Sequence, residues 1–353
     1  LNSTGAVLVG VVGSDDVTPV TTGVAGSFGD KTVGSGKAVT ISGLTLGGTA
    51  AGNYTVTQPA TTATITSKTL TVTGITAANK VYDDTTTATL TTTSAALVGV
   101  ETGDVVTLDT SSATGAFADA AKGSGKTVTV AGLTLTGADA GNYSLSPPTT
   151  TADITAKQLT VTGITAANKT YDGATTATLT TTAATLVGVE TGNTVVLNAS
   201  LAAGTFADTL PATGKTVTIT GLTISGVDAT NYDLVQPTTT ADITAQALTV
   251  TGVTAANKVY DATITATLDF TGAALVGIVG SDTVTLDSSA ATGAFADKTI
   301  GSTKAVTVAG LTLTGADAAG YTVTAPTPTA DITAAPLTVT GTLVTTKVYD
   351  GTT

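Results

Sequence analysis

A lysine, a tyrosine and two aspartates stand close together in the segment ANKVYDDTTTATL, residues 78–90. Lys80, Tyr82 and Asp83 could form a cation or sugar site, with the tyrosine ring as a stacking surface and the carboxylate as a hydrogen-bond acceptor. The structural alternative makes Tyr82 a half-buried anchor whose hydroxyl ties a turn, while Asp83 bonds the backbone of that turn and Lys80 stays in water. We favour the structural alternative, because the segment recurs along the chain and would give identical sites in every copy.

Aspartates are candidate ligands for calcium, which needs six to eight oxygens gathered at short range. The aspartates that recur partly along the chain are Asp104, Asp109, Asp119, Asp139 and Asp153. They are scattered, no DxDxDG run is present, and the paired carboxylates Asp15-Asp16 and Asp83-Asp84 are not repeated throughout. We therefore expect aspartates that stabilise turns, with no metal site and no cofactor.

Nucleophilic catalysis lacks its usual residues in this chain. Serine and threonine are abundant, but there is no histidine to activate them and no cysteine to replace them. We expect no catalytic residue, and the protein is not expected to be an enzyme.

A lysine–asparagine isopeptide crosslink is a weaker covalent alternative. Its candidates are Lys80, Lys126, Asn79 and Asn142. Lysine is rarely buried, and Gly320 replaces the second asparagine in the last full repeat. Glycosylation sequons are a further weak signal, since abundant threonine creates them by chance; they occur at Asn2, Asn53, Asn142, Asn168 and Asn198.

All these candidates belong to an internal repeat of 89 residues. One tyrosine series is Tyr82, Tyr171, Tyr260 and Tyr349, and a second is Tyr54, Tyr143, Tyr232 and Tyr321. No insertion or deletion breaks the register, so each repeat should have the same fold and the same loop lengths.

The spacing divides the chain into five parts. They are a partial repeat that lacks its first strand, 1–69, three full repeats, 70–158, 159–247 and 248–336, and the first strand and turn of a further repeat, 337–353. Linkers as short as Ala156–Gln158 predict a stiff rod or fibre. The incomplete ends fit an excerpt from a longer array; alternatively, residues 337–353 complete the first sheet of another molecule by strand addition.

Within one repeat, apolar and hydroxyl residues alternate with a period of two, as in LTVTG from Leu70 and KTVTVAGLTLTG from Lys126. This pattern predicts strands with one buried and one exposed face. Residues 94–104 are the single helical candidate, and their valines and glycines favour a strand and a turn. About seven strands in 89 residues indicate an all-β, immunoglobulin-like sandwich. A β-solenoid would need a shorter period, and a β-grasp fold would need a helix.

Composition excludes some partners. The formal charge of -12 and the pI near 4.1 argue against nucleic acid, and all 13 basic residues are lysines, so no arginine is available to bind phosphate. No run of 18 apolar residues is present, so no membrane span is expected. The lack of cysteine and methionine is typical of a secreted chain that avoids oxidisable side chains.

The segments LTVTGITAANKVYDDTTTATL, LVGVETGDVVTL and TGAFADAAKGSGKTVTVAGLTLTGADAGNYSL, followed by TADIT, resemble the YDG domain. This domain occurs in tandem arrays of filamentous-haemagglutinin-like bacterial surface adhesins. The naming motif matches at Gly173 and Gly351, whereas Asp84 and Ala262 replace the glycine. If that position needs a left-handed backbone, aspartate tolerates it better than alanine. The resemblance implies an extracellular stalk or adhesive repeat on a bacterial envelope, without enzymatic activity.

Two functions follow as expectations. In the first, the repeats are a structural stalk or fibre of a large secreted or cell-surface adhesin, projecting a binding region or building filaments and matrix. In the second, the repeats are weak multivalent adhesive modules that bind glycans or each other, or they polymerise head to tail by strand complementation. The expected partners are neighbouring repeats, other copies of the chain, and host or matrix glycans. The scarcity of arginine, tryptophan and clustered aromatics favours the first.

Overall fold

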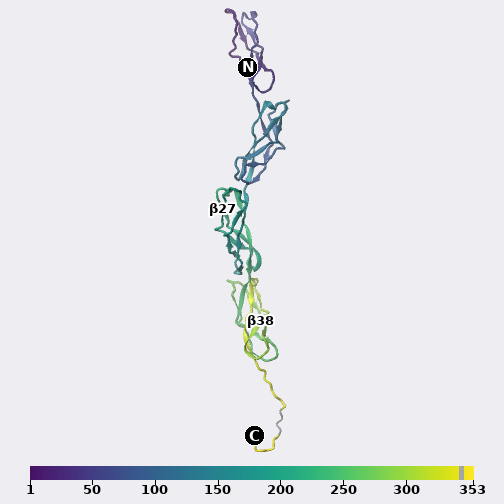
Figure 1. Cartoon of the computed structure of the whole chain (residues 1–353), viewed down its shortest axis with the longest axis vertical. Coiled ribbons are helices and arrows are strands. Elements are labelled where there is room, and N and C mark those ends of the chain that lie inside the picture. Colours follow the sequence, from purple (N-terminus) through teal and green to yellow (C-terminus); the bar gives the residue numbers. More distant parts are fainter. Residues whose placement is uncertain (342–345) are drawn as a thin grey trace. The chain divides into compact units, whose positions relative to one another are not determined.

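The computed structural model describes residues 1–341 and 346–353 (Figure 1). These residues form β-strands, turns and four short 3-10 helices, with no α-helix among them, so the all-β prediction is confirmed. Contacts define two compact units, Leu1–Lys157 with Thr230–Tyr232, and Gln158–Ala229 with Asp233–Thr353. We refer to residues 1–69, 70–158, 159–247 and 248–336 as repeats 1 to 4.

Repeat 2 shows the full set of elements. They are β6 (Lys68–Thr73), β7 (Thr76–Ala77), β8 (Lys80–Val81), β9 (Thr87–Ala88), β10 (Leu90–Thr91), β11 (Ala96–Val98), β12 (Thr107–Asp109), β13 (Thr114–Phe117), β14 (Gly123–Ala131), β15 (Thr134–Thr136), η2 (Ala140–Asn142), β16 (Tyr143–Leu145) and β17 (Thr149–Thr155). The prediction of about seven strands is wrong, because turns break the stretch between β6 and β11 into four strands of two residues each. The helical candidate at 94–104 forms β11 and a turn, as predicted.

Four small sheets make up repeat 2. The largest has the order β8-β17-β14-β13-β9, a second has the order β11-β6-β16, and β10-β7 and β12-β15 are two-stranded. Strand β6 lies between an antiparallel and a parallel neighbour, with Val72 opposite Leu97 and Leu70 opposite Leu145. The first strand of the repeat is therefore inserted between two later strands, which ties the start of the repeat to its end.

The other repeats follow the same order. Repeat 3 contains β18 (Lys157–Thr162), β19 (Thr165–Ala166), β20 (Lys169–Thr170), β21 (Thr176–Ala177), β22 (Leu179–Thr180), β23 (Thr185–Val187), β24 (Val196–Asn198), β25 (Ala203–Phe206), β26 (Ala212–Thr220), β27 (Thr223–Ser225), η3 (Ala229–Asn231), β28 (Tyr232–Leu234) and β29 (Thr238–Thr244). Repeat 4 contains β30 (Gln246–Thr251), β31 (Thr254–Ala255), β32 (Lys258–Val259), β33 (Thr265–Ala266), β34 (Leu268–Asp269), β35 (Ala274–Val276), β36 (Thr285–Asp287), β37 (Thr292–Phe295), β38 (Gly301–Ala309), β39 (Thr312–Thr314), η4 (Ala318–Gly320), β40 (Tyr321–Thr324) and β41 (Thr329–Thr333). Repeat 1 contains β1 (Thr18–Val20), β2 (Ala25–Phe28), β3 (Gly34–Ser42), β4 (Thr45–Gly47), η1 (Ala51–Asn53) and β5 (Ala60–Ile65).

The alternating pattern decides which residues form the core. In β14, Val128 and Val130 are buried, while the threonines between and before them are exposed. Ile154 of β17 and Phe117 of β13 are buried with them. The β-branched threonines fit the same pleated strand, and their hydroxyls face solvent.

A glycine separates the two strands of the run KTVTVAGLTLTG. Gly132 lies between β14 and β15 with a φ of +74°, and a Cβ atom there would approach the backbone oxygen of Ser112 to 2.1 Å. Both the left-handed backbone and the close approach exclude a side chain at this turn.

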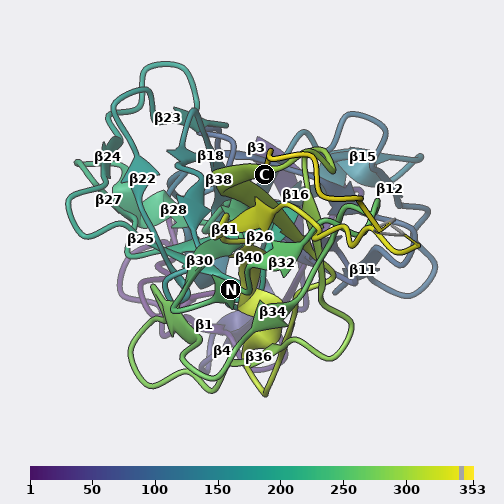
Figure 2. The ribbon, with the colours of Figure 1, turned by 90° about the horizontal axis from the view of Figure 1, so that it is seen from below.

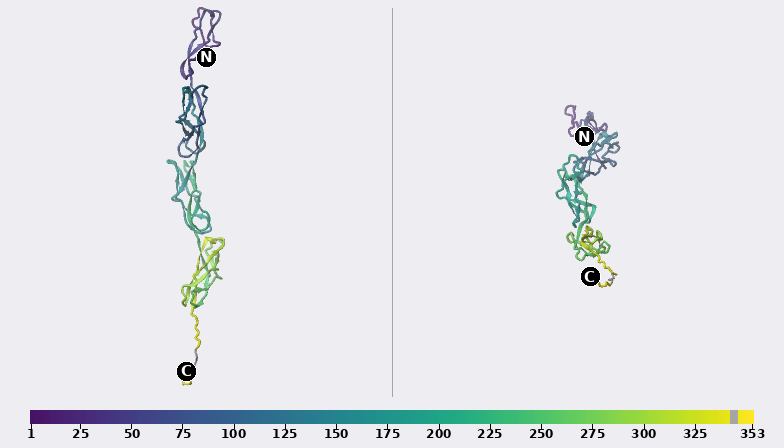
Figure 3. Two further views of the ribbon diagram at one scale, coloured as in Figure 1. Left: turned by 90° about the vertical axis from the view of Figure 1, so that its right-hand side faces the viewer. Right: turned by 60° about the horizontal axis from the view of Figure 1, so that its bottom comes forward.

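Residues after β41 form no strand as far as Gly341 (yellow in Figure 3). The predicted first strand of a further repeat is thus not formed at Leu337–Gly341, and residues 342–345 of the same predicted segment lie outside the described residues. The turn does form, since Lys347 Nζ lies 2.8 Å from Asp350 Oδ1 and the Thr352 N–H donates to the same oxygen.

Candidate functional site: the tyrosine turn

The Lys80 ammonium is enclosed by the turn that follows it. Its Nζ lies 2.6 Å from Asp83 Oδ1 and donates to the backbone oxygens of Thr85 and Thr87 at 3.0 and 3.2 Å. It also lies 5.9 Å from the centre of the Phe117 ring. The side chain is only 16% exposed, so the prediction that Lys80 stays in water is wrong. Burial is tolerated because carbonyl and carboxylate oxygens replace the lost water.

We call this arrangement, a lysine bound to the aspartate and backbone oxygens of the turn that follows it, the lysine clamp. It recurs in repeats 3 and 4. Lys169 Nζ donates to the backbone oxygens of Ala174 and Thr176 at 2.6 and 3.1 Å, and lies 5.6 Å from the Phe206 ring centre. Lys258 donates to the backbone oxygens of Thr263 and Thr265, both at 2.9 Å.

The clamp closes the five-stranded sheet. In repeat 2 the lysine belongs to β8 and the Thr87 carbonyl to β9, which are the two edge strands of that sheet. Edge strands leave backbone groups unpaired, and the ammonium satisfies one such carbonyl across the gap. The lysine therefore has a structural role that its charge alone does not indicate.

Asp83 stabilises the turn as predicted. Its Oδ1 accepts the Thr85 N–H at 3.0 Å and the Thr85 hydroxyl at 2.8 Å. Although burial raises the pKa of Asp83, hydrogen bonds from Lys80 and Thr85 more than offset it, and the pKa lies below its ordinary value. In repeat 4 the hydrogen bonds from Lys258 and Thr263 lower the pKa of Asp261 to about 2.

The position after this aspartate has a left-handed backbone, so the condition considered for the family motif is met. The φ angles are +74° at Gly173, +59° at Asp84 and +66° at Ala262. Glycine adopts this conformation freely, and aspartate tolerates it better than alanine does. The alanine in repeat 4 is accordingly strained.

Tyr82 and Tyr171 are buried more completely than predicted. They are 3% and 6% exposed, whereas Tyr260, in the last full repeat that the structure describes, is 39% exposed. The Tyr82 hydroxyl donates to Asp84 Oδ1 at 3.0 Å, so it ties its own turn as predicted. The Tyr171 hydroxyl instead donates to Asp282 Oδ2 of repeat 4 at 2.9 Å.

Tyr171 packs against a tyrosine of the second series. Its ring meets Tyr321 edge to face, with ring centres 5.1 Å apart and an interplanar angle of 66°. Tyr321 donates its hydroxyl to Asp282 Oδ2 at 2.6 Å and accepts the Val279 N–H at 2.9 Å. Burial and the bond to Asp282 raise the pKa of Tyr171 to about 12, and the same causes raise the pKa of Tyr321.

The tyrosine–aspartate pair is present in other repeats. Tyr54 donates to Asp15 at 2.7 Å in repeat 1, and Tyr143 donates to Asp104 at 2.7 Å in repeat 2. Asp282 in repeat 4 thus belongs to a tyrosine–aspartate pair within its own repeat and accepts the Tyr171 hydroxyl in addition.

A hydrophobic core runs through this contact from repeat 3 into repeat 4. Tyr171, Phe206 and Val217 of repeat 3 belong to one buried cluster with Leu248 and Tyr321 of repeat 4. Leu248 lies on β30 and Tyr321 on β40, two parallel paired strands labelled in Figure 2. Sequence analysis missed this role of the tyrosine, which is to bind the following repeat.

Asparagine and lysine side chains join repeats 1 and 2. Asn142 Oδ1 accepts the Val33 N–H at 2.9 Å, and Lys31 pairs with Asp104 and, at 3.5 Å, with Asp139. Asn231 Oδ1 accepts the Lys122 N–H at 3.0 Å in the same compact unit. The asparagine that precedes a tyrosine of the second series, as Asn142 precedes Tyr143, thus forms a second kind of contact between repeats.

The aspartates considered for calcium each have a different hydrogen-bond partner. Asp109 accepts the Ser111 N–H, Asp119 the Ala121 N–H, Asp139 the Val105 N–H and Asp153 the Gly125 N–H, while Asp104 binds Tyr143 and Lys31. Asp15 and Asp16 have different partners, Tyr54 and the Thr49 N–H. Among residues 1–341 and 346–353, no group of three or more acidic, histidine or cysteine side chains could hold a metal ion.

The isopeptide candidates are not brought together. Lys126 Nζ pairs with Asp119 at 2.5 Å, Asn142 binds Val33, and Asn79 accepts the Asp153 N–H at 2.8 Å. Each lysine and each asparagine therefore has its own structural partner.

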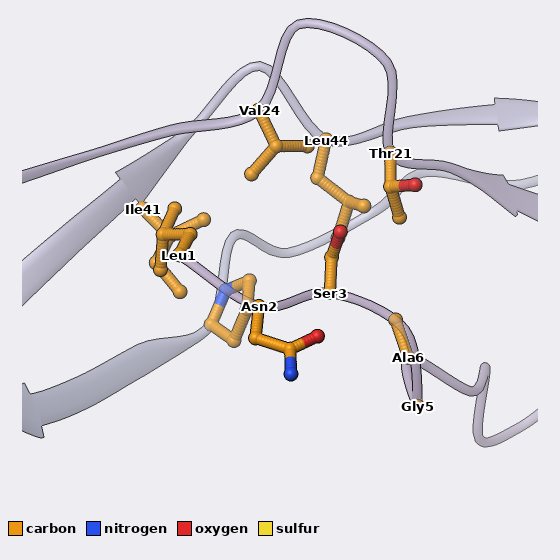
Figure 4. Close-up of a pocket in the computed structure, with 10 residues that line it drawn as sticks. Leu1, Asn2, Ser3, Gly5, Ala6, Thr21, Val24, Ile41 and Leu44 are labelled. Atoms are coloured by element: carbon orange, nitrogen blue, oxygen red, sulfur yellow. The ribbon is translucent and has the colours of Figure 1, made fainter.

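Repeat 1 has an apolar groove of about 420 Å³ lined by Leu1, Val24, Ile41 and Leu44 (Figure 4). The positions of Ile41 and Leu44 correspond to Ile219 and Leu222 of repeat 3. Those two residues are buried in one cluster with residues Val161 and Ile164 at the start of the repeat. The groove thus corresponds to the place of the first strand in a full repeat.

Comparison with known families agrees with this repeated architecture. The model of the YDG domain matches residues 1–63, 66–152, 155–241 and 244–330. The chain belongs to the YDG domain family. No curated protein matches these YDG repeats. A crystal structure of the I9-I11 tandem from titin is similar at 8% identity, with 75% of this chain and 98% of that chain covered and a TM-score of 0.21, which is too low to inform the fold. In the described part of the chain, no helix has the length and hydropathy needed to cross a membrane.

Proposed function

We propose that these YDG repeats are structural repeats of a large secreted or cell-surface bacterial adhesin. They act as a stalk that projects a binding region, or as the body of an extracellular filament or matrix. The observation that carries the proposal is the core shared by repeats 3 and 4, since the tyrosine that names the family motif is used to hold the next repeat.

The shared core supplies a stabilising contact between repeats. The exposed fraction of Tyr171 is smaller than that of Tyr260, in the last full repeat described, by about a third of the residue surface. A third of a tyrosine side chain is roughly 70 Å², and at ~25 cal/mol per Å² this burial contributes about 2 kcal/mol. Nearest-neighbour contacts of this size stabilise each repeat against unfolding and oppose bending between adjacent repeats.

The lysine clamp supports the same role. Each clamp fixes the turn that presents the tyrosine, because the ammonium binds the aspartate of the turn and two backbone oxygens that follow it. A turn fixed in this way loses less conformational entropy when the next repeat docks. The secreted location is proposed from the composition, which lacks cysteine and methionine.

Small-angle X-ray scattering of the full chain over a concentration series tests the stalk. The longest strands have nine residues, so each repeat should add about 30–40 Å to a thin particle whose length is independent of concentration. Tyr171→Ser should increase the spread of particle lengths, while Tyr260→Ser serves as the matched control. A wild-type profile of freely jointed domains would contradict the proposal, and growth in length with concentration would favour assembly of copies instead.

The cellular location needs a separate test. An antibody against the chain should label intact bacteria, and protease treatment of intact cells should remove the label. Labelling only after permeabilisation would contradict the extracellular role.

A further inference from the structure

Residues at the junctions between repeats vary in pairs. Asn142 and Asn231 accept a backbone N–H from Val33 and Lys122, which are 89 residues apart. The next residue in this series of donors is Pro211, which has no N–H. The corresponding acceptor position is Gly320, so the donor and the acceptor are lost at the same junction.

The space at Gly320 is used by the neighbouring repeat. A Cβ atom built on Gly320 would lie 2.6 Å from Cζ of Tyr171. Real Cβ atoms do not approach this closely, so any side chain at Gly320 would displace the ring. The glycine therefore allows the Tyr171 hydroxyl to reach Asp282.

A second pair of positions varies with the first. Tyr82 has an acceptor in its own turn, Asp84, and the residue of repeat 3 that corresponds to Asp282 is the neutral Asn193. Tyr171 has Gly173 in place of Asp84, and its carboxylate acceptor is Asp282. At each of these two junctions the sequence has one carboxylate in this pair of positions, Asp84 for Tyr82 and Asp282 for Tyr171.

We propose that the two faces of a junction are matched, so that a YDG repeat accepts a following repeat whose variable residues complement its own. The partner of the Tyr171, Gly173 and Pro211 face is a repeat that carries Asp282 and Gly320. The order of repeats is then encoded at their junctions. This inference goes beyond the proposed function, because it applies whether the array is a stalk or an adhesive.

Substitutions in the full chain test the match, with amide hydrogen exchange measured by mass spectrometry on peptides covering 169–174 and 315–324. Gly320→Asn should displace Tyr171 and speed exchange in both peptides about tenfold, which corresponds to about 1.4 kcal/mol. The combined variant G173D/P211K/D282N/G320N installs the residues of the preceding junction and should restore slow exchange. Gly141→Asn is the matched control, since no atom lies within 4 Å of a Cβ at Gly141.

A peptide covering 292–309 reports whether repeat 4 itself stays folded, because it contains the buried Phe295 and Val306. With that peptide protected, acceleration of about threefold or more by Gly320→Asn and recovery in the combined variant would support the match. Acceleration below about threefold, or a combined variant that exchanges as fast as Gly320→Asn, would overturn it. Loss of protection in 292–309 with Gly320→Asn would leave the combined variant as the deciding comparison: recovery supports the match and continued loss refutes it.

Discussion

Replacing Tyr171 by alanine should destabilise repeat 4 as well as repeat 3. The ring is 6% exposed and packs with Leu248 and Tyr321 of the following repeat. Truncation of a buried aromatic side chain typically costs about 3–5 kcal/mol, because the lost burial and the cavity both count. Part of this free-energy cost should come from the lost contacts with Leu248 and Tyr321 across the junction between repeats 3 and 4.

Tyr260→Ala separates that part from the cost within one repeat. Tyr260 lies in the equivalent turn but is 39% exposed, so its removal should cost about 2 kcal/mol less than removal of Tyr171. Tyr171→Phe isolates the hydroxyl bond to Asp282. It should cost about 1.5 kcal/mol, the lower end for a bond to a charged group, since Tyr321 still donates to the same oxygen.

Differential scanning calorimetry of the full chain measures these costs. For a cooperative unit of two repeats, each kcal/mol shifts Tm by roughly 2–4 °C, so Tyr171→Ala should lower the transition by roughly 6–20 °C. Peptide-resolved hydrogen exchange shows which repeats carry the loss. Equal shifts for the alanine variants of Tyr171 and Tyr260, or loss of protection confined to repeat 3, would refute the shared core.

Three further predictions concern single groups. Tyr171 has a pKa of about 12 in the folded chain, above the ordinary 10.0, so the free energy of unfolding should fall as the pH rises from 10 to 12. The fall should be smaller in Tyr171→Phe. Equal slopes of unfolding free energy against pH for the wild type and Tyr171→Phe would contradict this. Lys80→Met should lower the free energy of unfolding by about 1–3 kcal/mol, because it leaves turn carbonyls without a donor; urea unfolding followed by tyrosine fluorescence measures it. Lys68→Met is the control and should cost little, since Lys68 and its partner Glu101 are 48% and 66% exposed. Similar costs for the two variants would argue against the clamp. Gly132→Ala should cost more than Gly103→Ala by the same measurement, since both have positive φ but a Cβ is blocked only at Gly132.

The regular part of this fold could be predicted from the sequence. Alternation of valine and threonine identified β14, and the buried Val128 and Val130 follow directly from it. The period of 89 residues fixed the repeat number. The short strands around Lys80 could not be predicted, because two-residue pairings depend on side-chain contacts and leave no periodic pattern.

The tyrosine contact could not be predicted for a different reason. Tyr171 and Tyr321 are 150 positions apart, and a regular repeat offers several equivalent partners for each residue. The burial of Lys80 was missed because lysine is usually exposed, and only its carbonyl partners make burial favourable. One signal was available: Pro211 and Gly320 depart from the pattern at the two positions whose equivalents are hydrogen-bonded between repeats elsewhere in the chain.

Each of the three residues of the YDG motif meets a different physical requirement. In repeat 3, Tyr171 is required by the following repeat, Asp172 by its own turn and by the clamp lysine, and Gly173 by a backbone with positive φ. These requirements differ in cost, since strain at a left-handed residue is about 1–2 kcal/mol, whereas loss of a buried ring is about 3–5 kcal/mol. Other residues can therefore replace the glycine, as Ala262 does, without loss of the turn, but replacement of the tyrosine would separate neighbouring repeats.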